Sequence, residues 1–88
     1  MSTGRLERSL LQQALARRLR ASRTRLGWSQ ERLASTAGLD RSYVGDIERG
    51  VVSPTLQTLE KLSLALGIPA SELIRIEAAD AADKKIAS

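Results

Sequence analysis

Residues 29–50 read SQERLASTAGLDRSYVGDIERG, and this stretch decides the fold. It contains two short segments with apolar residues at helical spacing, joined by the residues AGLD. Ser29 and Asp40 are residue types that cap helix N-termini, and Gly38 and Gly50 are typical of helix C-termini. The stretch therefore predicts two short helices joined by a sharp turn.

The spacing of small and apolar residues meets the steric demands of two helices that cross at a steep angle. Ala34 lies where the helices touch closely, so only a small side chain fits there. Gly38 lies at the turn, which needs a left-handed backbone that glycine adopts without penalty. Val44 and Ile47 give the second helix an apolar face. Together these positions predict a helix-turn-helix unit.

The rest of the chain predicts three further helices. Their expected limits are about Leu6 to Leu26 for the first, Pro54 and Thr55 to Gly67 for the fourth, and a start at Pro69 for a short fifth helix, PASELIRI. Leu56, Leu59, Leu62 and Leu66 should line the inner face of the fourth helix. We expect a compact all-α domain over residues 1–76. Residues 77–88 have little to bury and are expected to form a flexible tail.

Composition narrows the function classes. The 88 residues include no cysteine and no histidine, so the commonest metal ligand and general base are missing. No metal, cofactor, small-molecule ligand or enzymatic activity is expected. No membrane span or secretory signal is visible, and a cytoplasmic location is expected.

The net charge is +4, and residues 1–50 carry about +5 through ten arginines against five acids. Arginine suits phosphate recognition, although a solvated charged surface is an equal alternative.

Residues 17–76 resemble the DNA-binding domain of the xenobiotic-response-element (XRE) family, the five-helix fold of lambda-type phage repressors and Cro. The resemblance lies in RLGWSQERLASTAGLDRSYVGDIERG (25–50) and SPTLQTLEKLSLALGIPASELI (53–74). It implies a transcriptional regulator that binds a roughly palindromic operator in double-stranded DNA as a homodimer. GLDRSYVGDIERG is especially similar to controller proteins of restriction–modification systems, which implies control of such genes. The alternatives are an antitoxin-type regulator and a helix-turn-helix module for protein contacts.

Four residues on the outer side of the second short helix are candidate base readers. Arg41 is the first choice, because arginine pairs bidentately with guanine, and a phosphate contact is its alternative. Ser42 can donate or accept at a base edge. Gly45 would let the backbone approach the bases closely, unless it is merely tolerated. Asp46 could accept from cytosine, repel wrong sequences or orient Arg41 or Arg49, and the orienting role is favoured.

Five residues are candidate phosphate contacts: Ser29, Gln30, Tyr43, Arg49 and Thr55. The resemblance places Gln30 against a phosphate, and the free amides of a helix N-terminus also attract an anion. Thr55 starts another helix and would act in the same way, beside its role as a cap. Tyr43 could instead pack at the edge of the core.

The resemblance also implies a structural ion pair between Arg23 and Glu48. Ile68, Leu73, Ile74 and Ile76 form an apolar excess around the fifth helix, which we expect to be a homodimer interface. The alternative is that the tail covers them. A twofold dimer would place two recognition helices about one DNA turn, ~34 Å, apart.

Overall fold

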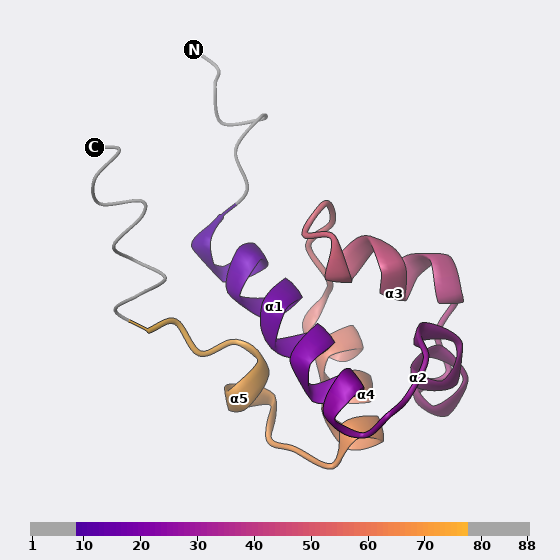
Figure 1. Cartoon of the computed structure of the whole chain (residues 1–88). Helices are drawn as coiled ribbons and strands as arrows, with labels where there is room; N and C mark the ends of the chain where they lie inside the picture. The colour runs from indigo at the N-terminus through magenta and orange to yellow at the C-terminus, as the bar shows by residue number, and fades with distance from the viewer. Residues whose placement is uncertain (1–8, 78–88) are drawn as a thin grey trace.

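The computed structural model describes residues 9–77. Within that range the chain forms five α-helices and no β-strand, which confirms the predicted fold class (Figure 1). The helices are α1 (Leu10–Arg25), α2 (Gln30–Ala37), α3 (Arg41–Glu48), α4 (Leu56–Leu66) and α5 (Ala70–Leu73). The helix α1 runs between α3 on one side and α5 on the other, and it contacts both.

The turn between α2 and α3 has the predicted geometry. Gly38 has φ 72° and ψ 36°, which is the left-handed conformation that favours glycine. The amide of Leu39 donates to the carbonyl of Ala34 at 2.8 Å, which closes the end of α2. Asp40 then caps α3 by accepting from the amide of Ser42 at 3.1 Å. The two short helices therefore have the limits that their capping residues predict.

The core gathers leucine, isoleucine, valine and alanine side chains from all five helices. Its buried members are Leu15, Leu19, Leu33, Ala34, Ala37, Val44, Ile47, Leu59, Leu62, Leu66 and Leu73. Trp28, Leu39 and Tyr43 pack against its edge. Because aromatic side chains only border this core, its stability depends on close packing of aliphatic groups.

The first helix begins later than expected, at Leu10 instead of about Leu6. Ser9 has an extended backbone, with φ −65° and ψ 158°. Its hydroxyl accepts from the amide of Gln12 at 2.9 Å, and the side chain of Gln12 accepts from the amide of Ser9 at 3.4 Å. This reciprocal capping box defines the start of α1. Residues 1–8 and 78–88, including most of the expected tail, lie outside the described range.

Two expectations about the C-terminal half are wrong. Leu56 does not face the core, since its side chain is 81% exposed. It is the first residue of α4, and its direction on the helix lies about 60° from that of Leu59, the nearest buried leucine. The fifth helix is also shorter than PASELIRI: it ends at Leu73, and Ile74 leaves the helical region with φ −112° and ψ 21°.

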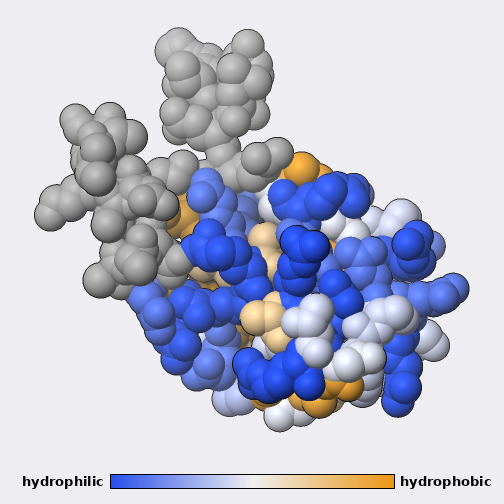
Figure 2. All heavy atoms as spheres, in the orientation of Figure 1, coloured by the Kyte–Doolittle hydropathy of each residue, from blue (hydrophilic) through white to orange (hydrophobic). Residues whose placement is uncertain are grey.

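Figure 2 shows one face of the molecule, on which hydrophilic side chains predominate and hydrophobic areas are small. Among residues 9–77, none of the helices has the length and apolar character needed to cross a bilayer.

Candidate nucleic-acid interface

The helix α3 has a buried side and an open side. Val44 and Ile47 are 0% and 1% exposed and anchor the helix in the core. Arg41, Ser42 and Arg49 are exposed on the other side. Within residues 9–77, no other segment covers these side chains. The open surface on which the DNA-binding hypothesis depends is therefore present in the described part of the protein.

Arg41 is the first residue of α3, and its side chain is exposed. Within the described range it has no hydrogen bond or ion pair, so its guanidinium donors are available for a partner outside the protein. Ser42 is less free, because its hydroxyl donates to the carboxylate of Asp40. This bond and the amide of Ser42 hold the pKa of Asp40 below its usual range. The cap of α3 is thus fully formed at neutral pH and weakens as Asp40 protonates in acid.

Asp46 pairs with Arg49, one turn further along α3. This contact is one of the two orienting roles considered for Asp46, and it involves Arg49 and not Arg41. The two side chains are 37% and 64% exposed, so the pair lies at the surface, where an ion pair contributes little stability. The ion pair with Asp46 holds the guanidinium of Arg49 near Gly45, in the middle of α3.

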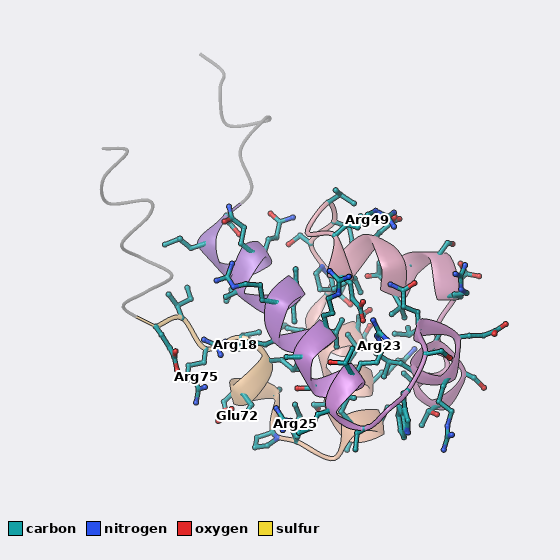
Figure 3. The ribbon with its side chains drawn as sticks, viewed as in Figure 1. Arg18, Arg23, Arg25, Arg49, Glu72 and Arg75 are labelled. Atoms are coloured by element: carbon teal, nitrogen blue, oxygen red, sulfur yellow. The ribbon has the colours of Figure 1, made fainter. Side chains whose placement is uncertain are left out.

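Gly45 is buried, which contradicts its expected place on the open surface. A Cβ atom built on Gly45 would lie 3.3 Å from Nη1 of Arg49 and 3.5 Å from Oε1 of Gln30 (Figure 3 labels Arg49). The two long side chains therefore lie over the glycine. A glycine in the middle of α3 leaves space for the side chains of Arg49 and Gln30, which a Cβ atom at this position would crowd.

Replacing Gly45 by alanine is expected to raise the free energy of unfolding by about 0.5–1 kcal/mol, because alanine is the better helix former. The nearest obstacle is the tip of a flexible arginine, which can move aside. The same change should weaken DNA binding, since it displaces Arg49 and Gln30. Urea unfolding and a DNA titration of the same protein measure the two effects. A loss of stability would show that Gln30 and Arg49 cannot rearrange.

An ion pair joins α1 to α3. Nε and Nη2 of Arg23 donate to the two carboxylate oxygens of Glu48 at 2.6 and 2.9 Å. The side chains are only 11% and 3% exposed. Nη1 of Arg23 also donates to the carbonyl of Trp28 at 2.7 Å, in the turn before α2. The hydrogen bond to Glu48 raises the pKa of Arg23 above its ordinary value, so the guanidinium stays charged.

Gln30 belongs to the same network. Its Nε2 donates to Oε1 of Glu48 at 3.0 Å, while its Oε1 faces Gly45. Sequence reasoning treated Gln30 only as a phosphate contact and missed this bond. The two residues are far apart in the chain, so no local pattern predicts their contact. Because Gln30 links α2 to Glu48, the network fixes the start of α2 relative to α3.

The N-termini of α2 and α4 each lie near a residue of α3. Ser29 caps α2 by accepting from the amide of Arg32 at 3.0 Å, and Thr55 caps α4 by accepting from the amide of Thr58 at 3.1 Å. The hydroxyl of Tyr43 in α3 donates to Oγ1 of Thr58 at 3.4 Å, and its ring borders the core. Tyr43 thus connects α3 to the first turn of α4. The predicted phosphate contacts Ser29 and Thr55 lie at positively polarised helix ends.

The expected dimer residues do not form one surface. Leu73 is 0% exposed, so it cannot contact a second subunit and belongs to the core. It is buried because α5 packs against both α4 and α1. Ile68 and Ile74 are half-buried, and only Ile76, at 44%, is openly exposed.

Two short helices at a glycine turn, with an open second helix, define the class of helix-turn-helix proteins. The helix-turn-helix family model matches residues 19–73. The chain belongs to the XRE-type helix-turn-helix family.

Similar proteins carry the names of regulators. A Neisseria meningitidis "hypothetical transcription factor" is 44% identical over 64 residues, which are 73% of this chain and 60% of that protein. The control protein C.BamHI of Bacillus amyloliquefaciens is 41% identical over 66% of this chain and 69% of its own length. The crystal structure of the restriction–modification controller protein C.AhdI from Aeromonas hydrophila has a TM-score of 0.69 and 48% identity, covering 70% of this chain and 94% of that chain. The match thus spans less than two thirds of the Neisseria protein.

Proposed function

We propose that this protein regulates transcription as a homodimer that binds a roughly palindromic operator, with α3 of each subunit in the major groove. The single observation that carries the proposal is Arg41 at the start of α3, which is exposed and has no partner among residues 9–77. The major groove admits an α-helix and displays guanine O6 and N7, which an arginine can bind bidentately. The N-termini of α2 and α4 beside α3 would fix the helix against the phosphates.

The residues have different roles in this proposal. Arg41 reads a base, and Ser42 reads a base edge once its hydroxyl leaves Asp40. Asp46 orients Arg49, which contacts a phosphate. Gly45 serves by leaving room for Gln30 and Arg49, so that both can reach the DNA backbone.

Selection of bound sequences from random duplex DNA tests the proposal. The intact protein should enrich an inverted repeat, and Arg41→Ala should lose the preference for one guanine per half-site at a cost of about 1–3 kcal/mol. Arg49→Ala is the matched control, because losing a phosphate contact should weaken binding to all sequences alike and reduce its salt dependence. If Arg41→Ala keeps the full sequence preference, Arg41 does not read a base. If the intact protein enriches no sequence, the regulator function is wrong for this chain.

The surface that best suits a homodimer lies beside α5. Leu11, Leu56 and Ile76 are 42%, 81% and 44% exposed. Two shallow cavities in this region share Leu59 and Ile74 in their lining. Burying such side chains in a twofold contact would give favourable hydrophobic free energy and would explain why Leu56 faces outward.

We further propose that the regulated genes belong to a restriction–modification system. The support is the likeness to C.AhdI and C.BamHI, which extends over most of those proteins. Restriction and methyltransferase genes beside an enriched operator would agree with this assignment. A toxin gene in that place would instead favour the antitoxin alternative.

A further inference from the structure

A small polar cavity lies between α1 and α5, on the side of α1 away from α3 (Figure 3). Its volume is about 110 Å³. The lining residues are Arg18, Ala21, Ser22, Arg25, Ile68, Glu72 and Arg75. Figure 3 shows the three arginines and Glu72 gathered at this place, whereas Arg49 lies across α1 on α3. The cavity is therefore separate from the candidate nucleic-acid interface.

Ser22 is one of the lining residues. The residue is only 8% exposed, yet its hydroxyl makes no hydrogen bond within residues 9–77. No side-chain oxygen in that range is both fully sealed from solvent and unpaired, so the hydroxyl of Ser22 is open to solvent, and Ser22 is among the residues that line the cavity. A polar group this deeply placed normally has a partner. The hydroxyl of Ser22 is therefore available to donate a hydrogen bond to a ligand in the cavity.

The arginines of the cavity come from α1 and from the segment after α5. Arg18 and Arg25 lie one turn before and one turn after Ser22 on the same face of α1. Arg25 has no hydrogen bond or ion pair to the described residues. Nε of Arg18 donates to the carbonyl of Arg75 at 2.7 Å, which ties α1 to the segment after α5. The sequence shows the arginines of α1, but only the tertiary fold brings Arg75 to them.

Two carboxylates partly offset these charges. Glu72 and Glu77 pair with Arg75 at 3.2 and 3.0 Å, and Glu77 also lies 3.6 Å from Arg18. Among residues 9–77, three guanidinium groups therefore face two carboxylates, and Arg25 is the arginine that pairs with neither of them. The pairs hold the arginine side chains in place around the cavity before any ligand arrives.

We propose that this cavity binds a small oxyanion, namely inorganic phosphate or the phosphate group of a small metabolite. Guanidinium groups bind phosphate oxygens with paired, charge-assisted hydrogen bonds, and the hydroxyl of Ser22 can donate a further bond. The volume equals that of only a few water molecules, at about 30 Å³ each, so a drug-sized ligand would not fit. Bound phosphate would strengthen the contact between α1 and α5. The proposal does not depend on the proposed DNA-binding function.

Calorimetric titration of the intact protein with sodium phosphate tests this site, with sodium chloride used to keep the ionic strength constant. Ser22→Ala and Arg25→Ala should each weaken phosphate binding about tenfold, as expected for the loss of one charge-assisted hydrogen bond. Ser22→Ala should not lower the thermal unfolding temperature of the free protein, because it removes an unpaired hydroxyl. Arg25 is exposed, so its replacement should leave the fold intact.

Two control variants separate this site from a DNA-phosphate site. Arg20→Ala removes an exposed arginine of α1 outside the cavity, and Gln30→Ala alters the start of α2. Both should keep the phosphate affinity of the intact protein. The proposal is overturned if Ser22→Ala and Arg25→Ala bind phosphate like the intact protein, or if Gln30→Ala abolishes the binding. Glycerol 3-phosphate, used in place of phosphate, identifies the source: tighter binding of the ester indicates a metabolite, and tighter binding of phosphate indicates the free ion.

Discussion

Replacing Glu48 by alanine is expected to lower the free energy of unfolding by about 3 kcal/mol or more, because the change leaves the charge of Arg23 buried without its partner. Arg23 is 11% exposed and loses both hydrogen bonds to the carboxylate. Gln30 loses its acceptor in the same step. Urea unfolding followed by circular dichroism measures the change.

A double variant separates the cost of a stranded charge from the value of the ion pair. Arg23→Met combined with Glu48→Leu removes both charges and keeps apolar bulk between α1 and α3. Well-packed apolar residues often replace a buried ion pair at little cost, so the double variant should be more stable than Glu48→Ala. If Glu48→Ala unfolds like the intact protein, the ion pair does not brace the fold.

Replacing Leu73 by alanine is expected to lower the free energy of unfolding by about 2–5 kcal/mol, as for other fully buried leucines. Leu73 is 0% exposed and is the only residue of α5 that is buried. The loss should be the same at all protein concentrations, because the side chain packs within one subunit. Chemical unfolding at several protein concentrations measures it.

Leu56→Ala is the matched control, because the same leucine-to-alanine change is made at a side chain that is 81% exposed. It should leave the stability of the monomer nearly unchanged and should weaken the proposed dimer, which sedimentation equilibrium measures. If Leu73→Ala changes the association constant and not the stability of the subunit, Leu73 belongs to the interface after all. If Leu56→Ala leaves the association constant unchanged, the proposed dimer surface is wrong.

Much of the fold follows from local sequence. Ser29, Gly38 and Asp40 set the ends of α2 and α3, because caps and left-handed turns depend on residues close in the chain. The inward direction of Val44 and Ile47 follows from helical periodicity alone. The start of α1 was harder to predict, since the helical pattern continues toward Leu6 and the capping box at Ser9 ends it.

The candidate site was only partly predictable. The exposure of Ser42 and Arg49 follows from their position opposite Val44 and Ile47, and Arg41 lies on one flank of the same outward face of α3. The burial of Gly45 could not be predicted in the same way, because Arg49 and Gln30 both cover it and the side chain of Gln30 comes from another helix. The outward position of Leu56 and the burial of Leu73 depend on how α4 and α5 pack, and a run of leucines does not reveal which of them faces the core.

The sequence by itself determined five helical segments, the glycine turn and the face of α3 that is open, because each depends on residues within one or two helical turns. Only the tertiary structure decided that Gln30 and Arg49 cover Gly45, that Leu73 is core and Leu56 surface, and that Arg75 joins Arg18 beside Ser22. The physical reason is that these contacts join different helices, and their geometry is set by close packing of the whole core and not by any local preference.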